Sequence, residues 1–394
     1  MDFYTSPVFF GLLAVAIIPA IVLGLLEKPL RRWGMAVTIV FVLLLFCRSQ
    51  MQFAAFLAFL AVQAACTAVV LRSWKSGKKN LIAYRVALAA SIAPLAIYKV
   101  SAAFDGNLWG FIGISYLTFK SVAILIEIRD DLIKDIKPAD WFYFLCFFPV
   151  ITSGPIDRFR RFEEDAAKTW TRAEYMDLLT RGVLLLLVGA VYQLVIATVL
   201  QPASVPTTLA PDAPLWTNLW KAAHTAWAYG LYLFFDFAGY SLMAMGTSYC
   251  FGIKTPRNFR APFAALDIKD FWNRWHITLS FWLRDFVFMR FTFFALKRKL
   301  FDSRLTCAVC GYLINMTLMG AWHGLSPSYL AYGVYHGALL ALTDVFQKKS
   351  KFYKRHKNDL WFKTVSWVIT LNLIMFGFAL FSGQISSIVR SIYG

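Results

Sequence analysis

The amino-acid sequence predicts an all-α protein that crosses a membrane many times. Hydrophobic residues make up 59% of its 394 residues and charged residues only 16%, whereas a soluble domain carries about 25% charged residues. Several apolar runs approach or exceed the roughly 20 residues that an α-helix needs to cross a bilayer. No internal repeat, low-complexity tract or soluble domain separates these runs. We therefore expect a single membrane domain over residues 1–394, in a multi-pass protein of the cell membrane.

The positive charge of the chain lies mainly in a few loops between the apolar runs. The net charge is +18, which would suggest nucleic-acid binding if it covered one soluble surface. Lys and Arg residues confined to loops indicate instead cytoplasmic loops that face anionic lipid. A basic cytoplasmic face also attracts an acidic protein. We expect contacts with the lipid bilayer and with an acidic partner, and none with nucleic acid.

Five apolar runs in the first third of the chain predict membrane helices. They lie near residues 7–26, 34–46, 51–71, 81–98 and 107–126. The loop after the first run contains Lys28, Arg31 and Arg32, so we expect it in the cytoplasm and the N-terminus outside. No basic stretch precedes the first run, which argues against a cleaved signal peptide. The second run is short, and we expect its helix to extend beyond these bounds.

Residues 141–153 form an apolar run that is too short to span comfortably. The segment 158–181 after it contains six Lys and Arg residues, which would lie outside if the run crossed. The later loop 201–220 contains neither Lys nor Arg and is expected outside. Both observations agree if residues 141–155 enter and leave on the cytoplasmic side, with Gly154-Pro155 as the turn. Re-entrant backbone must be covered by protein or water, so we expect a cavity nearby.

The remaining apolar runs predict membrane helices in the second half of the chain. They lie near residues 183–200, 222–252, 305–322, 327–346 and 364–381. The segments 254–304 and 348–363 are rich in Lys and Arg, so we expect both in the cytoplasm. Gly324 can end one helix, and Ser326-Pro327 can cap and begin the next.

The segment 268–291 is predicted to be a helix with a polar stripe. Its polar residues lie three or four positions apart, which places them on one face of an α-helix. They are Lys269, Asn273, His276, Ser280 and Arg284. Such a helix could lie on the membrane surface, or its stripe could line a wet tunnel that opens to the cytoplasm. Both interpretations can hold for different parts of the segment.

Two histidines beside tryptophans are the main candidates for chemistry. His276 follows Trp275 in the polar stripe, and His323 follows Trp322 at the predicted break between two apolar runs. A histidine at membrane depth costs free energy unless it has a partner or faces water. A pair of them indicates proton-transfer chemistry inside the bilayer, although His323 could instead satisfy a loop carbonyl.

Other polar residues lie inside the apolar runs. His336 either packs through a hydrogen bond or supports the site. Asp236 needs a partner because an unpaired buried charge is costly. We expect that partner to be an Arg, a His or Tyr240, in a structural or a supporting role. Cys307 and Cys310 have no second pair or nearby His, so they predict packing residues and no metal site.

The motifs around these residues resemble the membrane-bound O-acyltransferase superfamily over roughly residues 107–340. The matching segments are Gly113-Ile-Ser-Tyr-Leu-Thr-Phe, Gly154-Pro-Ile, Phe235-Asp-Phe-Ala-Gly-Tyr-Ser, Phe271-Trp-Asn-Arg-Trp-His and Trp322-His-Gly. The resemblance implies about 10–12 membrane helices, with re-entrant and interfacial helices, in a ring around a central tunnel. It also implies peripheral spans at 1–106, a catalytic core at 107–346, and a basic loop with the last span at 347–394.

The segments that begin at Asn258 and Asp267 look like the branch of the superfamily that D-alanylates teichoic acids of Gram-positive cell walls. This resemblance implies a D-alanyl group that arrives as a thioester on the phosphopantetheine arm of an acidic carrier protein. The carrier would dock at the cytoplasmic face, and a hydroxyl of teichoic acid outside would accept the group. Other proteins of D-alanylation, including a small membrane peptide, are implied partners. No covalently bound cofactor is implied.

For such a transfer His323 is the candidate base. His276 would orient the substrate or stabilise charge on the carbonyl oxygen, and the two roles could be exchanged. The expected supporting residues are Asn273, Arg274, Ser280, Arg284, Asp236, Tyr240, Trp322 and His336. The alternatives are an exopolysaccharide (alginate-type) O-acetyltransferase of the same superfamily and a transporter, which would also place ionisable groups at midplane.

Residues 286–300 are predicted to dock the acidic carrier protein. An apolar patch there is followed directly by a basic cluster, which suits a partner that combines a hydrophobic contact with negative charge. The residues expected to contact it are Val287, Met289, Lys297, Arg298 and Lys299. The alternative is plain anchoring of the segment in the membrane interface.

Overall fold

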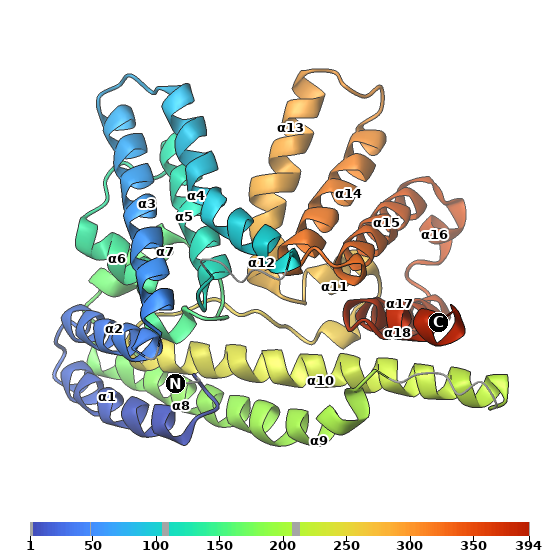
Figure 1. The fold of residues 1–394 in the computed structure, drawn as a ribbon, viewed down its shortest axis with the longest axis horizontal. Coiled ribbons are helices and arrows are strands. Elements are labelled where there is room, and N and C mark those ends of the chain that lie inside the picture. Colours follow the sequence, from blue (N-terminus) through green and yellow to red (C-terminus); the bar gives the residue numbers. More distant parts are fainter. Residues whose placement is uncertain (1–2, 48, 105–109, 207–212, 394) are drawn as a thin grey trace. The chain divides into compact units, whose positions relative to one another are not determined.

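The structure, a computed structural model, describes residues 3–47, 49–104, 110–206 and 213–393. Every regular element within these ranges is helical, which confirms the predicted all-α class (Figure 1). Six described helices are long and apolar enough to cross a membrane, namely Pro7–Leu25, Gln50–Lys75, Leu81–Ala103, Arg172–Ser204, Arg304–His323 and Leu360–Phe381. The larger predicted number of membrane helices and their arrangement around a tunnel stay predictions.

The contacts divide the chain into two compact units. The first consists of Met1–Val191 and Gly239–Arg257, and the second of Tyr192–Ala238 and Asn258–Gly394. The long helix α10 (Leu215–Cys250) contributes to both. The expected single domain, with boundaries near residues 106 and 346, is not tested by this division.

The first unit begins with five helices. They are α1 (Pro7–Leu25), α2 (Arg31–Phe46), α3 (Gln50–Lys75), α4 (Leu81–Ala103) and α5 (Ile114–Arg129). The short second run is extended at its N-terminal side, as predicted. The fifth helix begins later than predicted, and residues 107–109 of the predicted run lie outside the described residues. Gly113 precedes α5 with φ 91°, a left-handed conformation that favours glycine, and a Cβ there would collide with the carbonyl of Ile151.

The segment predicted to be re-entrant forms only short elements. They are α6 (Pro138–Cys146), the 3₁₀ turn η1 (Phe148–Val150) and α7 (Phe159–Ala167). The nine residues of α6 rise about 14 Å as a helix, less than half of a hydrocarbon core of about 30 Å. Residues 141–153 therefore cannot cross as one helix, in agreement with the predicted turn-back.

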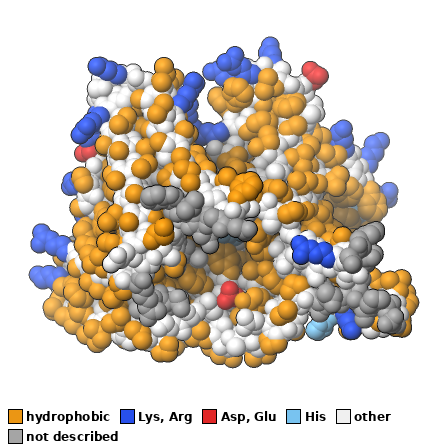
Figure 2. Space-filling view, viewed as in Figure 1, with side chains coloured by type: hydrophobic (Ala, Val, Ile, Leu, Met, Phe, Trp, Pro, Cys, Tyr) orange, Lys and Arg blue, Asp and Glu red, His pale blue; other side chains and the backbone are white. Residues whose placement is uncertain are grey.

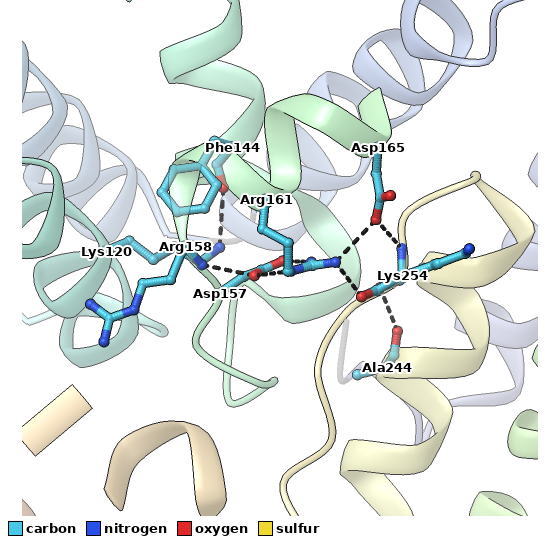
Figure 3. A network of polar contacts seen from close by, with 9 residues as sticks. Lys120, Phe144, Asp157, Arg158, Arg161, Asp165, Ala244 and Lys254 are labelled. Atoms are coloured by element: carbon cyan, nitrogen blue, oxygen red, sulfur yellow. Dashed lines mark hydrogen bonds and ion pairs between the residues drawn. The ribbon is translucent and has the colours of Figure 1, made fainter. Parts of the chain in front are cut away.

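Charged side chains fix both ends of this segment (Figure 3). The buried ammonium of Lys120 donates to the carbonyls of Phe144 (3.1 Å) and Leu145 (3.4 Å) at the end of α6, where a cation complements the helix dipole. Arg161 of α7 pairs with Asp157 and Asp165 and donates to the carbonyl of Lys254. The cations thus satisfy backbone carbonyls and carboxylates that would be costly to bury alone.

The first unit continues through α8 (Arg172–Ala190). The chain then forms the π-helix η2 (Val191–Ala197), α9 (Thr198–Leu200) and the 3₁₀ turn η3 (Gln201–Ser204). Within the predicted outer loop, residues 207–212 lie outside the described residues. A Cβ at Gly189 of α8 would lie 2.7 Å from the carbonyl oxygen of Gly239 in α10. The absence of side chains there lets the two helices approach closely, as small residues do in membrane bundles.

The second unit contains the segment 268–291, and the prediction of one continuous helix there is wrong. The segment forms α11 (Ile268–Trp272), α12 (Ile277–Leu283), the π-helix η5 (Arg284–Phe288) and α13 (Met289–Lys297). His276, between α11 and α12, is left-handed with φ 43° and ψ 50°. The break is held by distant backbone, because Ile277 N–H donates to the Asn258 carbonyl (2.8 Å) and Arg260 N–H to the Arg274 carbonyl (3.0 Å).

The predicted hairpin of two helices is confirmed in the second unit. It consists of α14 (Arg304–His323) and α15 (Pro327–Lys349). A Cβ at Gly333 would lie 2.5 Å from the Met316 carbonyl oxygen, so the two helices pack in close contact. Ser326 and Pro327 begin α15 as predicted, although the Ser326 side chain makes no capping bond. Gly324 ends α14 in an extended conformation, where a Cβ would lie 2.6 Å from the Tyr329 ring.

Three helices complete the second unit. They are α16 (Lys351–His356), the predicted last span α17 (Leu360–Phe381), and α18 (Gln384–Tyr393), which was not predicted. Figure 2 shows Lys and Arg side chains at the loops joining α3 to α4 and α13 to α14, whereas the helix sides are mostly hydrophobic. This distribution agrees with the loops predicted to be cytoplasmic.

Candidate active site

Both candidate histidines line one small cavity inside the second unit. Its volume is about 50 Å³, which is room for one or two water molecules at most. Its walls come from α10, α11, α12, α14, α15 and α17, together with the turn before α12, and are largely aromatic. They are formed by Leu233, Phe237, Trp272, Trp275, His276, Leu279, Met319, His323, Tyr332, Phe378 and Phe381. Two titratable groups facing one apolar cavity are the arrangement expected of an active site.

His276 is held by its backbone. Besides the two bonds at the break, the hydroxyl of Thr278 donates to the Asn258 side chain at 2.6 Å. A non-glycine residue at positive φ is costly and persists only where the surroundings hold it. The ring lies edge-on to Phe237 with centroids 4.7 Å apart, and its Nε2 has no hydrogen-bond partner among the described residues.

Burial determines the charge of His276. The side chain is 4% exposed, and burial, followed by the nearby His323, lowers the pKa of His276 to about 3. Its position just before α12 acts in the same direction, because a helix N-terminus disfavours positive charge. His276 is therefore neutral at physiological pH and can donate a hydrogen bond from one ring nitrogen.

His323 is the last residue of α14, one position before Gly324. Its ring packs edge-on to Phe381 at 4.8 Å and contacts Trp322 at 4.4 Å. The side chain is partly exposed, in contrast to His276. The carboxyl end of a helix stabilises a cation. The end of α14 thus differs from the start of α12, which disfavours positive charge.

A second cavity of about 230 Å³ contains most of the predicted polar stripe. Lys269, Asn273, Ser280 and Arg284 all line it, whereas His276 does not, and the wet tunnel stays a prediction. Lys269 also pairs with Asp344 at 2.8 Å, and Arg284 lies over the Phe281 ring at 4.2 Å. The Ser280 hydroxyl donates to the Trp275 carbonyl at 3.1 Å.

Three side chains line both cavities and separate them. They are Trp272, Leu279 and Met319, which we call the dividing wall. The wall is almost completely buried. A molecule that entered the polar cavity would reach the histidines only if this wall moved.

The structure separates several predicted supporting residues from the histidine cavity. Trp322 lies near both histidines, with centroids 6.3 Å from His276 and 4.4 Å from His323. Arg274 instead pairs with Asp270 at 2.7 Å. His336 is fully buried outside this cavity, edge-on to Trp272 at 5.2 Å. Its ring makes no hydrogen bond among the described residues, so the expected packing through a hydrogen bond is not found there. Its supporting role stays a prediction.

The prediction of the Asp236 partner is wrong. Its carboxylate accepts a hydrogen bond from Gln193 Nε2 at 3.2 Å, and Gln193 lies in the π-helix η2. The hydroxyl of Tyr240 pairs instead with Thr152, in the turn after η1 of the first unit. A neutral amide meets the need of the carboxylate for a donor without a second buried charge.

Some residues of the site were missed by sequence reasoning. Trp272 and Asn258 stand inside motifs that the sequence displays, so their proximity to His276 in the chain was the available signal. Met319 and Phe381 give no such signal. They look like ordinary apolar residues of membrane helices, and only the packing of α14 and α17 brings them to the cavity.

The predicted docking segment presents exposed apolar and basic side chains. Met289 is 55% exposed and Phe293 70%, and Lys297, Arg298 and Lys299 follow at the end of α13. Val287 lies in η5 and is half-buried. Over the described ranges, no group of three or more His, Cys, Asp or Glu side chains is placed to hold a metal ion.

A model of the membrane-bound O-acyltransferase family matches residues 35–387 of the chain. The chain belongs to this family. It is therefore an acyltransferase of the membrane. The predicted resemblance to this superfamily is confirmed.

Curated relatives of two kinds match the chain. The teichoic acid D-alanyltransferase of Bacillus subtilis is 39% identical, over 97% of this chain and 98% of the relative. The enzyme of that name in Streptococcus thermophilus is 34% identical, over 98% and 96%. A probable alginate O-acetylase, AlgI, of Pseudomonas syringae is 30% identical over 72% of this chain and only 51% of the relative.

Proposed function

We propose that this chain is a teichoic acid D-alanyltransferase of the cell membrane. The observation that carries the proposal is the coverage of the relatives. The relatives of that name match almost end to end, at 39% and 34% identity, whereas the alginate acetylase shares about half of its own length. The donor is a D-alanyl thioester on the phosphopantetheine arm of an acidic carrier protein, and the acceptor is a hydroxyl of teichoic acid.

The chemistry assigns one task to each histidine. His323 removes the proton of the acceptor hydroxyl while its oxygen attacks the thioester carbonyl carbon. Neutral His276 donates a hydrogen bond to the oxygen that becomes negative. When the carbon–sulfur bond breaks, the proton on His323 passes to the leaving sulfur. The ester and a free thiol are then formed, and both histidines regain their initial state.

The two cavities support a route for the donor. The polar cavity is the larger, at about 230 Å³, and is lined by Lys269 and Arg284. These cations are paired with Asp344 and Asp285, and the phosphate of the arm would share them with these carboxylates. The histidine cavity of about 50 Å³ cannot hold a D-alanyl thioester unless the dividing wall opens. Entry of the arm therefore requires a rearrangement of Trp272, Leu279 and Met319.

The carrier protein docks on α13 in this proposal. The exposed Met289 and Phe293 supply a hydrophobic contact, and the cluster Lys297–Lys299 supplies positive charge for an acidic partner. Met289→Asp should abolish carrier binding by the purified protein in detergent, where no anionic lipid competes. Unchanged carrier affinity in that variant would indicate that α13 only anchors the protein in the membrane.

The experiment that tests the function is transfer in vesicles. The purified protein is reconstituted, and carrier loaded with labelled D-alanine is added together with membranes that contain lipoteichoic acid. We expect labelled ester on the teichoic acid and free thiol on the carrier. Transfer from an acetyl donor to an exopolysaccharide, with none of D-alanine, would assign the chain to the acetyltransferase branch.

A further inference from the structure

A groove between α15, α16 and α17 lies outside the active site. Its volume is about 620 Å³, within the range of sites that bind small molecules. Its walls are aliphatic and aromatic side chains of α15 and α17, notably Leu339, Leu342, Phe346, Ile369 and Leu373. It shares no lining residue with either cavity of the active site.

One part of the groove is basic. Lys357 and Lys363 line it together with Tyr353 and Trp361, where α16 leads into α17. Neither lysine forms an ion pair within the described part of the chain, whereas neighbouring Lys348 is paired with Asp344 at 2.7 Å. The groove thus joins a long apolar surface to two cations without partners and to aromatic side chains.

Asp267 is the acid in the lining, and its carboxylate is already engaged. It accepts from the Gln347 amide at 2.9 Å and from the Asp270 backbone N–H at 2.8 Å. These donors leave the two lysines as the groups that recognise a charged ligand. An anion with long apolar chains can pair with the two lysines and cover the apolar walls of the groove.

We propose that this groove binds one anionic glycerophospholipid. The phosphate lies against Lys357 and Lys363, and an acyl chain lies along Leu342, Ile369 and Leu373. Lysines near a membrane surface attract anionic headgroups, and an apolar groove excludes water from the chain. Walls from three helices make this a defined site, unlike the convex side of a single helix.

Two hydrogen bonds connect α17 to the segment that precedes α11. The indole of Trp367 donates to the Phe263 carbonyl at 2.7 Å, and the Thr370 hydroxyl to the Leu266 carbonyl at 3.2 Å. The chain then enters α11, which ends with Trp272 in the dividing wall. A lipid in the groove covers this connection and should raise the temperature at which the second unit unfolds. The proposal does not depend on the identity of the acyl donor.

The test is lipid binding measured by native mass spectrometry. The purified protein is titrated in detergent with phosphatidylglycerol and, separately, with phosphatidylcholine. We expect one phosphatidylglycerol to stay bound in preference to phosphatidylcholine. Lys357→Gln with Lys363→Gln should weaken phosphatidylglycerol binding about thirtyfold, from the usual contribution of two lysines.

The matched control makes the same change in net charge within the adjacent helix α16. Lys351→Gln with Lys354→Gln removes two lysines that do not line the groove, and its loss should be several times smaller. An equal loss for both pairs would show diffuse attraction and overturn the proposal. Unchanged binding after removal of Lys357 and Lys363 would overturn it as well.

A second variant tests the groove without changing charge. Ser366→Phe places a ring in the groove, and Ser366 lies on its wall. This variant should lose the bound lipid while it elutes as a single species of unchanged size. Retention of phosphatidylglycerol at the original affinity by Ser366→Phe would show that the lipid binds elsewhere.

Discussion

The turn that carries His276 and the helix end that carries His323 meet at one cavity, but they differ in burial and in local charge. His276 stands at positive φ and is almost completely buried. Its turn is fixed by the bond from Ile277 N–H to the Asn258 carbonyl and the bond from Arg260 N–H to the Arg274 carbonyl. His323 is partly exposed at the carboxyl end of α14. The start of α12 disfavours positive charge, and the carboxyl end of α14 favours it.

Because their environments differ, two identical side chains can have different tasks in the reaction. A group that stays neutral can polarise a carbonyl through a hydrogen bond without taking up the acceptor proton. A group near a helix carboxyl end can hold that proton until the leaving sulfur needs it. Enzymes commonly assign acid and base roles by placing two titratable groups in environments that shift their pKa values in different directions.

The largest effect is expected from His323→Ala. Loss of a general base typically costs about 10²–10⁴-fold in rate, so transfer of D-alanine should be abolished in practice. Expression and elution should match the unmodified protein, because His323 is partly exposed and not a core residue. Near-normal D-alanine ester on teichoic acid at equal expression would remove His323 from the mechanism.

A smaller but severe effect is expected from His276→Ala. Removal of one donor to a developing oxyanion costs about 10²–10³-fold. His276→Gln should recover part of this loss, because a side-chain amide can donate the same kind of hydrogen bond. His323→Gln should recover nothing, since an amide cannot take up a proton. Equal rates for both Gln variants would contradict the division of tasks.

The dividing wall should control the size of the acyl group. Met319→Ala enlarges the histidine cavity, so a donor with one more methylene than D-alanine should be used about tenfold better relative to D-alanine. Met316→Ala is the matched control, because Met316 is equally buried on the same helix but lines only the polar cavity. A similar gain from both variants would show that the wall is not the selective element.

The smallest expected effect concerns stability and pH. Because burial lowers the pKa of His276 to about 3, from an unfolded value near 6.5, the unfolded chain binds more protons between these values. The contribution of His276 to the free energy of unfolding is therefore fully present above about pH 6.5. It falls as the pH decreases, by about 2 kcal/mol at pH 5. His276→Gln should reduce the drop in unfolding temperature between pH 7 and 5. An unchanged drop would indicate that His276 is hydrated.

Local signals account for the parts of the fold that the sequence predicted. Gly324 and Ser326-Pro327 are next to one another in the chain and mark the end of α14 and the start of α15 without help from distant residues. The stripe at 268–291 also had regular helical spacing, yet the helix breaks. Its break depends on Asn258 and Arg260, whose pairing with residues 274–277 is not visible in a periodic pattern.

The candidate site, like the fold, was predicted where the sequence carries a local signal and was missed elsewhere. The Trp-His motifs identified both histidines, which the structure brings to one cavity. The Asp236 partner was missed because Gln193 reaches it from a π-helix that no local signal predicts. Phe381 was missed because a phenylalanine in a membrane helix is ordinary in sequence and acquires meaning only through packing.

Chemical rescue by imidazole tests most directly whether His323 is the base and His276 the hydrogen-bond donor. Removal of an imidazole side chain leaves space in which added imidazole can bind and act as a base. The initial rate of D-alanyl transfer is measured for His323→Ala and His276→Ala as the imidazole concentration rises at constant pH. We expect a saturable increase for His323→Ala and little change for His276→Ala. Rescue of His276→Ala alone would contradict this expectation and exchange the two roles.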